Sequence, residues 1–406
     1  MTRLSNRRDT NIESTKRPLV SDRHRRPDEA NGFQVGMRIA FIGQKGIPAT
    51  YGGIEDYVEK VSTRLVRRGH QVTVFCRPHY SSGNGTYQGV RLKRTPSVAT
   101  KHLDAISHTL LCSLQSLAGD FDLVNYQALG PSSLSFVPRL SGMAKVVATI
   151  HSLDWQRDKW NAWAKRLLKL AEYPSVRFPD KVAVVSQSLK EYFEQRTPKE
   201  VVKIPTGVDP PVLRKPEKIR RYGLEENNFI LFLNRLVPEK GCHLLIQAFR
   251  EVDTDKKLFI AGDGRFSEDY VKSLRGTAGD RIIFGGYVEE DLLQELYTNC
   301  YLYVLPSMVE GISQSVLVAL SYGKAVLVSD IQENLEAVQD CGFTFRNRDV
   351  SDLRTRFEIL LKRPDLVRAD KERRKRYVQD NFSWDRAAQS LEALFSDCLN
   401  GGRRVE

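Results

Sequence analysis

The residues best placed for chemistry in this sequence lie in one stretch, residues 307–323. A short apolar run precedes the stretch, and an apolar-periodic segment ending at a glycine follows. The pattern therefore predicts a buried strand, a turn and a helix. Glu310 stands in the turn, while Gly311, Ser313 and Gln314 open the predicted helix. Free amides at a helix N-terminus attract anions, and a carboxylate accepts hydrogen bonds from hydroxyl groups. The stretch suits a polyhydroxylated anionic ligand, although an ordinary capped helix has the same pattern.

A second charged turn follows the predicted strand at residues 229–233. Arg235 and Lys240 lie on either side of this strand-to-helix turn, so both side chains can reach one diphosphate. Arginine contributes a planar fork of donors and lysine a mobile point charge, and both suit phosphate oxygens. An ordinary basic loop is the alternative interpretation.

Two further candidates lie in the first half of the chain. A glycine-rich turn at residues 43–53 separates a predicted strand from a predicted helix, an arrangement that brings backbone amides close to a phosphate or sugar. Its glycines do not fit the G-x-G-x-x-G dinucleotide pattern, and Gly52 and Gly53 are its candidate contacts. His151 ends the predicted strand at residues 145–151, at the edge where parallel sheets bind ligands. A structural turn and a packed or capping histidine are the alternatives.

Together these stretches resemble a known family. Residues 307–330, with Glu310-Gly311 and Gly323 in place, resemble the donor-site segment of retaining glycosyltransferases of family 4. Residues 234–241 are similar to a second segment of that family. Residues 46–55 are similar to a bacterial polysaccharide branch with rhamnosyltransferase-like members. The resemblance covers about residues 37–400, with motifs in both halves of the chain.

The resemblance implies a role for each candidate. Glu310 holds hydroxyl groups of the transferred sugar, and His151 contacts that sugar from the opposite domain. Arg235 and Lys240 stabilise the departing diphosphate, so that neither a metal ion nor a cofactor is needed. The residues implied in donor binding, besides Arg235 and Lys240, are Gly52, Gly53, Val288, Gly311, Ser313, Gln314 and Val318.

The reaction implied by the resemblance moves a hexosyl group from a nucleotide-diphosphate sugar to a saccharide or lipid-linked acceptor, with retention of configuration. Its expected setting is cell-surface polysaccharide biosynthesis. A nucleotide-sugar epimerase of the same fold is disfavoured by the segment around Glu310.

One position departs from the family pattern. The family has a second glutamate eight residues after Glu310, which accepts hydrogen bonds from the donor ribose, and this chain has Val318 there. Gln314 lies one helical turn earlier on the same predicted face, so its amide is the expected neutral replacement. The departure supports a second hypothesis, a catalytically weak or silent subunit that binds a nucleotide sugar or a partner enzyme.

Length and element pattern predict the architecture. A chain of 406 residues exceeds what one core usually holds, and strands alternate with helices in both halves. We expect an α/β protein of the GT-B fold, with two doubly wound Rossmann-like domains facing a cleft. The expected parts are a disordered basic tail at 1–36, an acceptor-side domain at 37–206, a nucleotide-sugar-binding domain at 207–384, and a final helix at 385–406 that returns to the first domain.

Charge is unevenly distributed along the chain. Residues 37–205 hold 24 lysines and arginines against 13 acidic residues, whereas residues 206–406 hold 30 against 32. The excess predicts an anionic partner for the first half. No nucleic-acid-binding motif is visible, so an anionic membrane surface or a lipid-linked phosphate acceptor is expected. Residues 161–173 form either a basic amphipathic helix for such a surface or a helix packed on the sheet.

The remaining features indicate a protein that works inside the cell. No apolar run is long enough to span a membrane and no signal peptide is visible, so we expect a cytoplasmic location, peripheral to the inner face of the plasma membrane. The six cysteines lack metal-type spacing and are expected to be reduced. Asp253-Thr254-Asp255 follows a predicted helix in a polar turn, so it is interpreted as surface and no metal site is expected.

Overall fold

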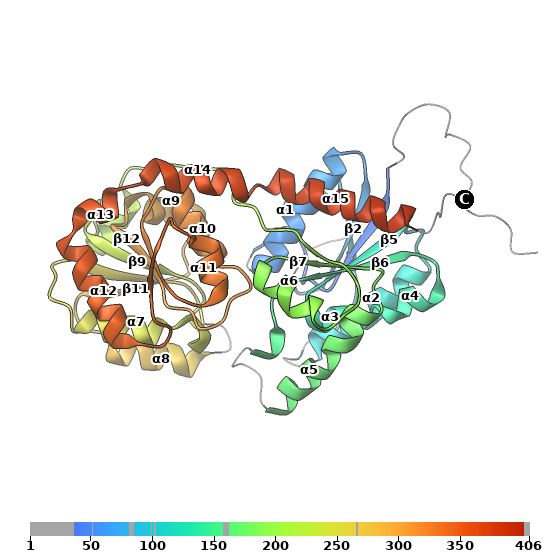
Figure 1. Cartoon of the computed structure of the whole chain (residues 1–406), viewed down its shortest axis with the longest axis horizontal. Helices are drawn as coiled ribbons and strands as arrows, with labels where there is room; N and C mark the ends of the chain where they lie inside the picture. The colour runs from blue at the N-terminus through green and yellow to red at the C-terminus, as the bar shows by residue number, and fades with distance from the viewer. Residues whose placement is uncertain are drawn as a thin grey trace, which may run out of the picture. The chain divides into compact units, whose positions relative to one another are not determined.

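The computed structural model describes residues 36–50, 52–80, 85–98, 100, 103–156, 162–264 and 267–401. The predicted tail, apart from Gly36, and residues 402–406 of the predicted final helix lie outside these ranges. Met37–Glu406 form one compact unit, which contains two sheets with helices packed on both faces (Figure 1). This arrangement confirms the predicted class of two Rossmann-like α/β sheets.

The first sheet contains eight strands in the order β3-β4-β2-β1-β5-β6-β7-β8. All neighbouring pairs are parallel except β3 with β4, which is antiparallel and lies at the edge. The strands are β1 (Arg38–Ile42), β2 (Gln71–Cys76), β3 (Gly85–Tyr87), β4 (Val90–Arg94), β5 (Leu123–Gln127), β6 (Lys145–Ile150), β7 (Lys181–Val184) and β8 (Val201–Lys203). The helices are α1 (Gly53–Arg67), α2 (Asp104–Leu117), α3 (Leu129–Ser132), α4 (Phe136–Ser141), α5 (Ala162–Arg177) and α6 (Gln187–Glu194).

The second sheet contains six parallel strands in the order β11-β10-β9-β12-β13-β14. They are β9 (Phe229–Leu233), β10 (Lys257–Ala261), β11 (Ile282–Gly286), β12 (Leu302–Leu305), β13 (Val326–Ser329) and β14 (Phe343–Phe345). The first helices are α7 (Cys242–Arg250), α8 (Glu268–Thr277), α9 (Glu290–Asn299), α10 (Gln314–Ser321) and α11 (Gln332–Val338). The last are α12 (Val350–Lys362), α13 (Pro364–Arg368), α14 (Lys371–Asn381) and α15 (Trp384–Asn400).

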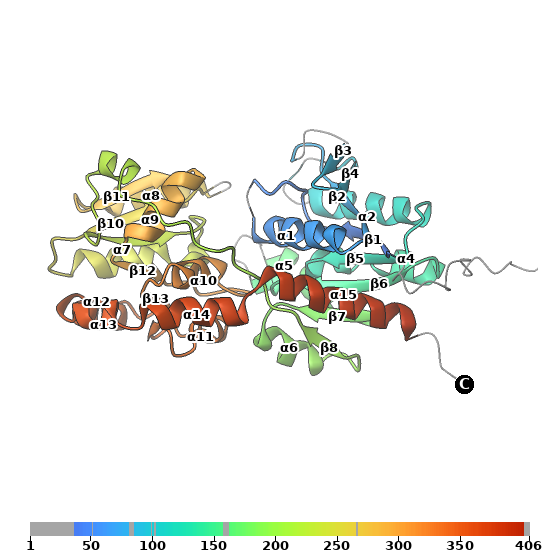
Figure 2. The same ribbon diagram turned by 90° about the horizontal axis from the view of Figure 1, so that it is seen from above.

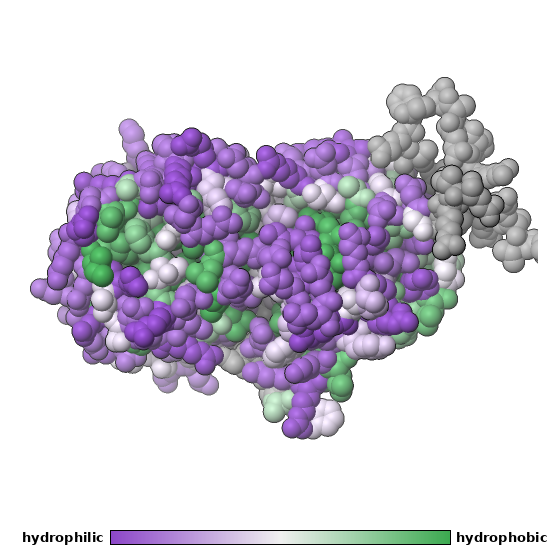
Figure 3. Space-filling model, viewed as in Figure 1, coloured by the Kyte–Doolittle hydropathy of each residue, from purple (hydrophilic) through white to green (hydrophobic). Residues whose placement is uncertain are grey.

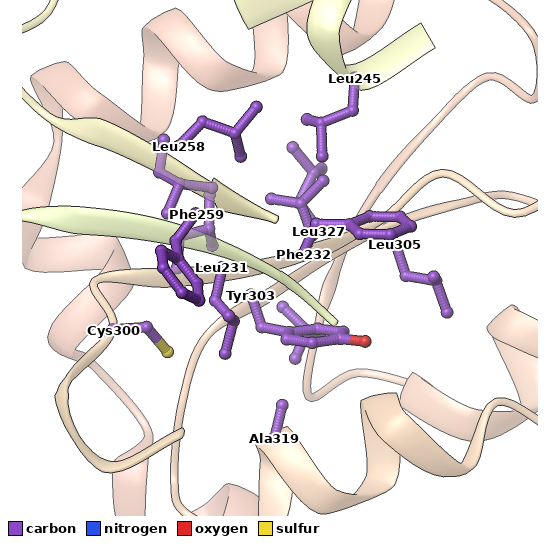
Figure 4. Packing of buried hydrophobic residues seen from close by; sticks show 14 of the residues in the cluster. Leu231, Phe232, Leu245, Leu258, Phe259, Cys300, Tyr303, Leu305, Ala319 and Leu327 are labelled. Atoms are coloured by element: carbon purple, nitrogen blue, oxygen red, sulfur yellow. The ribbon is translucent and has the colours of Figure 1, made fainter. Parts of the chain in front are cut away.

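The strands are continuous apolar runs because helices cover both faces of each sheet. The face drawn in Figure 3 is mostly hydrophilic, as expected when the apolar strand residues lie inside. In the second sheet, Leu231, Phe232, Phe259, Tyr303 and Leu327 are fully buried and interdigitate (Figure 4). The Tyr303 hydroxyl donates to the backbone oxygen of Leu233 at 2.9 Å, so this buried polar group is satisfied.

The last helix joins the core of the first sheet. α14 lies over the second sheet, and α15 continues beyond it along α1 (Figure 2). Leu391 and Phe395 of α15 are fully buried in the same hydrophobic cluster as Val58 and Val61 of α1. Glu392 accepts a hydrogen bond from His70, next to the start of β2, at 2.8 Å when that ring nitrogen carries the proton. The predicted return of the final helix is therefore confirmed.

We expect Leu391→Ala to lower the free energy of unfolding by about 2–5 kcal/mol, because it leaves a cavity where α15 meets α1. Denaturant titration of the whole chain checks this value. Gln389→Ala, on the exposed side of the same helix, is the matched control and should change stability by less than about 0.5 kcal/mol. Equal effects of the two substitutions would show that α15 does not stabilise the first sheet.

Candidate functional site

Two charged turns meet at one edge of the second sheet. β9 and β12 are parallel neighbours, so the turns that follow them lie side by side. Lys240 Nζ donates to Glu310 Oε1 at 2.6 Å, and both side chains are less than a tenth exposed. Arg235, on the same turn as Lys240, is exposed at the mouth of the site. The structure therefore brings together three of the predicted residues.

A small pocket lies between these turns and the end of β6 in the first sheet. Its lining includes Arg235, Lys240, Glu310 and Gly311 from the second half and Ser152 from the first. The pocket has a volume of about 40 Å³, which holds a water molecule but not a hexose. The space enclosed between these segments is therefore smaller than a hexose.

Gly311 shows how closely the two halves approach here. A Cβ atom at this position would lie 1.7 Å from the backbone oxygen of His151 and 3.3 Å from Cβ of Ser152. A contact of 1.7 Å with a backbone atom is impossible without movement of one segment. Glycine at position 311 thus allows the Glu310 turn to reach the end of β6.

His151 is held by two neighbours in the first half. Its Nε2 lies 2.8 Å from Oε1 of Gln127, a buried residue on β5, so this nitrogen donates when it carries the proton. The ring of Tyr57 packs edge-on against the imidazole, with ring centroids 4.8 Å apart. Sequence reasoning identified His151 but missed both residues that fix its ring, because they lie on separate elements.

The glycine-rich turn places the start of α1 in an open position. α1 begins at Gly53, and among the residues that the structure describes none has an atom within 4 Å of the position of a Cβ on Gly53. Gly52 has φ +106°, and a Cβ there would lie 2.0 Å from Oε2 of Glu55. Glu55 also accepts a hydrogen bond from the backbone nitrogen of Lys45 at 3.0 Å, which fixes the turn. The helix start can therefore be approached by an anion.

The start of α10 differs from the prediction. The sequence placed Gly311 and Ser313 in the first turn of this helix, but α10 begins at Gln314. Ser313 stands just before the helix, and its hydroxyl donates to Oδ1 of Asn334 at 2.5 Å. That hydroxyl therefore ties the Glu310 turn to α11, a contact that no local pattern could predict.

Gln314 does not point where the prediction placed it. Its Nε2 donates to Oδ2 of Asp56 at 3.1 Å and to the backbone oxygen of Gly207 at 3.4 Å. Its Oε1 accepts from the Thr206 hydroxyl at 3.5 Å. In this structure the amide joins α10 to α1 and to the segment between the sheets. The expectation that this amide replaces the missing glutamate toward a donor ribose stays a prediction.

Val288 and Val318 lie apart from the pocket. Both side chains are partly buried and pack against the hydrophobic core of the second sheet. Val318 is on α10 and Val288 follows β11. Neither lines the pocket around Glu310.

Lys45 is a cation that sequence reasoning missed. Burial lowers the pKa of Lys45, and the nearby charges of Arg77 and Arg235 lower it further, while Glu55 opposes them. Lys45 of the first half therefore lies close enough to Arg235 of the second half for their charges to interact. A lysine within a glycine-rich turn was the signal that could have identified it.

Within the part of the chain that the structure describes, we find neither a metal-binding cluster nor a membrane-spanning helix. In those ranges no three side chains of the histidine, cysteine, aspartate and glutamate types are grouped so that they could hold a metal ion. Likewise, none of the described helices combines the length and apolar character that crossing a membrane requires.

Two family models match the chain. The model described as Glycosyltransferase Family 4 matches residues 51–211, and the model described as Glycosyl transferases group 1 matches residues 214–384. The chain is also 30% identical over 260 residues to the lipopolysaccharide 1,2-N-acetylglucosaminetransferase of Salmonella typhimurium. This match covers 57% of the chain and 67% of that protein.

Solved structures with the same fold are more distant in sequence. Sucrose-phosphate synthase from Thermosynechococcus elongatus has a TM-score of 0.78 and 19% identity, over 90% of this chain and all of that chain. Anabaena HepE in complex with UDP-glucose has a TM-score of 0.73 and 18% identity, over 89% of this chain and all of that chain. These two likenesses bear on the fold alone, and they agree with the two Rossmann-like sheets.

The Asp56 carboxyl gives a pH-dependent prediction. Burial is the main cause that raises its pKa to about 6, and the negative charges of Asp209 and Glu59 add to the rise. The positive charge of Lys60 and the hydrogen bond from Gln314 act in the opposite direction and lower the pKa. The pKa is higher in the folded state than in the unfolded state, so ionising Asp56 destabilises the fold. This cost is absent below about pH 4, grows between about pH 4 and 6, and is fully present above that range. Asp56→Asn should therefore be about 2–3 kcal/mol more stable than the unmodified chain at pH 7.5, with a smaller difference at pH 5.

Denaturant titrations at the two pH values check this prediction. Asp253→Asn, in an exposed turn, is the control and should show no such dependence. An Asp56→Asn variant that is less stable than the unmodified chain at pH 7.5 would contradict the expected cost.

Proposed function

Because this chain belongs to the glycosyltransferases of the GT-B fold, we propose that it moves a hexosyl group from a nucleotide-diphosphate sugar to a saccharide or lipid-linked acceptor. The observation that carries the proposal is the Lys240–Glu310 pair beside Arg235, at the strand ends of the second sheet. The pair offers a carboxylate for sugar hydroxyls next to cations for a diphosphate. The Salmonella relative that acts in lipopolysaccharide synthesis supports a role in cell-surface polysaccharide synthesis.

Charge development explains the proposed roles. When the bond from the anomeric carbon to the donor oxygen breaks, the sugar ring gains positive charge and the diphosphate gains negative charge. Arg235 and Lys240 stabilise the diphosphate, and the open start of α1 adds backbone amides from the first half. These groups replace a divalent ion in the proposal. Glu310 orients the sugar through its hydroxyl groups.

We also propose that the reaction retains the configuration of the transferred sugar and that the chain belongs to the rhamnosyltransferase-like branch. Both rest on the resemblance of residues 46–55 and 307–330 to that family. His151 is proposed to meet the sugar from the first half, since its backbone already contacts Gly311. Its bond to Gln127 fixes the direction in which the ring points.

Closure of the two halves is part of the proposed cycle. The enclosed pocket of about 40 Å³ is smaller than the donor, and the proposed entry step is opening at the contact between Gly311 and His151. Reclosure would exclude water, so that the acceptor rather than hydroxide attacks the sugar. The proposed location is the cytoplasm, next to the inner face of the plasma membrane.

A second candidate function is a weak or silent subunit that binds a nucleotide sugar or a partner enzyme. Val318 favours this candidate because valine accepts no hydrogen bonds from a ribose. The engagement of Gln314 with Asp56 and Gly207 also favours it, since the nearest neutral substitute is directed elsewhere.

Arg235→Ala and Lys240→Ala should each lower turnover about 10²-fold, because each removes a charge that acts on the departing diphosphate. Release of nucleoside diphosphate from a panel of nucleotide sugars measures this effect. Arg250→Ala, at the exposed end of α7, is the matched control and should leave turnover unchanged. Near-normal rates for Arg235→Ala would contradict the assignment, and loss of activity in a chelator would contradict metal independence.

Val318→Glu should tighten binding of the nucleoside diphosphate by about one to two decades, because it restores an acceptor for ribose hydroxyls. Calorimetric titration of the unmodified chain, Val318→Glu and the uncharged control Val318→Gln measures the change. The control should recover only part of the gain. If neither the unmodified chain nor Val318→Glu binds any nucleoside diphosphate, the silent-subunit candidate is favoured.

A further inference from the structure

One layer of helices on the first sheet carries an unusual number of exposed apolar side chains. α2 packs with Ala40 and Ile42 of β1, whereas α1 and α15 pack with Ile39 and Phe41. Alternate residues of a strand point to opposite faces, so α2 covers the face opposite α1 and α15. α3 contacts both α2 and α5, and α4 contacts α2, so these four helices form one layer, here called the α2–α5 layer (Figure 1).

The outer side of α5 is apolar where a soluble helix is normally polar. Trp163, Leu167 and Leu170 follow the i, i+4, i+7 spacing of one helix face, and Tyr173 lies beside them. Their exposed fractions are 76%, 57%, 73% and 67%. The sequence left open whether this helix faces a membrane or the sheet. The structure shows that its inner side packs while these four side chains are exposed.

The neighbouring helices extend this apolar surface. Ile106, Leu110 and Leu114 form an exposed stripe on α2, and Leu140 and Met143 are exposed at the end of α4. Figure 3 shows hydrophobic atoms over the ends of α5 and α4 at the lower edge of this half. Of the 17 large apolar residues that are exposed in the described ranges, nine lie on helices of the α2–α5 layer, and Leu103 and Met143 flank α2 and α4. Such concentration on one layer marks an interaction surface.

The charges around this surface select the kind of partner. Lys165, Arg166 and Lys169 alternate with the apolar residues of α5, and its residues 162–171 include no acidic residue. Glu172 is buried and accepts hydrogen bonds from Trp155 and Tyr192, so it does not oppose these cations at the surface. A second copy of the chain would bring like charges together, whereas an anionic lipid surface complements them.

We propose that the α2–α5 layer inserts its apolar side chains into the headgroup region of an anionic lipid bilayer. Leucine and tryptophan side chains are typical of helices that lie in this region, with lysine and arginine reaching the lipid phosphates. The purpose of this lipid contact, which is to meet a lipid-linked acceptor at the bilayer, rests on the proposed function. Lipid binding itself requires no donor and is measured separately.

The position of α5 connects this surface with the candidate site. His151 directly follows β6, and the short helical turn Asp154–Gln156 comes next and contacts α5. Within this turn, Trp155 Nε1 donates to Oε2 of Glu172 on α5 at 3.1 Å. A bilayer under α5 would therefore lie close to the segment that carries His151, where an acceptor head group has to arrive.

Co-sedimentation of the full chain with vesicles tests the proposal. Vesicles of phosphatidylcholine with phosphatidylglycerol should bind the chain more tightly than phosphatidylcholine alone, and high salt should reduce this difference. Leu167→Ser with Leu170→Ser should weaken partitioning about 100-fold, roughly tenfold for each side chain. Leu213→Ser with Leu335→Ser, at exposed positions outside the α2–α5 layer, is the matched control and should change it less than about twofold.

Two further measurements decide between a bilayer and a protein partner. Arg166→Gln with Lys169→Gln should remove the preference for anionic vesicles, and the vesicle-induced blue shift of tryptophan emission should be smaller in Trp163→Phe than in the unmodified chain. Equal binding of the unmodified chain to both vesicle types would overturn the proposal, and so would vesicle binding of the Leu167→Ser/Leu170→Ser double variant that equals that of the unmodified chain. So would light scattering that shows a dimer for the unmodified chain and a monomer for that variant. Nucleoside diphosphate release with a soluble acceptor, measured on the same variants, reports separately on the proposed function.

Discussion

The ion pair between Lys240 and Glu310 is the interaction on which the candidate site depends. It joins the turn after β9 to the turn after β12, and both side chains are almost fully buried. Removing one member of such a pair leaves an uncompensated buried charge, which costs about 3–5 kcal/mol. Each residue therefore fixes the other, and Gly311, next to Glu310, is thereby held against the end of β6. A contact between two side chains of the second half thus also determines how closely the first half approaches.

Much of the fold could be predicted because its strands are apolar on both faces. β9 and β12 are such runs, and each precedes a turn with recognisable charged residues. β3 could not be predicted, since Gly85–Tyr87 has no apolar pattern and forms a strand only by pairing with β4 at the sheet edge. The C-terminal return of α15 was expected from family resemblance rather than from any local pattern.

The candidate site shows the same division between local and distant information. Arg235, Lys240 and Glu310 could be identified because their chemistry is visible within short segments. The orientation of Gln314 could not, because its amide meets Asp56, which is 258 residues away in the sequence. Likewise, the hydroxyl of Ser313 bonds to Asn334 instead of a ligand. Residue types indicated which groups could act, whereas side-chain direction depended on contacts between elements.

The crossing of α15 has a consequence for how the chain is made. The strands of the first sheet end at Lys203, yet Trp384, Leu391 and Phe395 complete the cluster that covers one of its faces. A ribosome adding about 5–20 residues each second reaches Trp384 some 10–40 s after Lys203. During that interval the nascent first half exposes the groove along α1 that α15 later fills. The hydrophobic core of the first sheet is therefore completed only after the whole second sheet has been made.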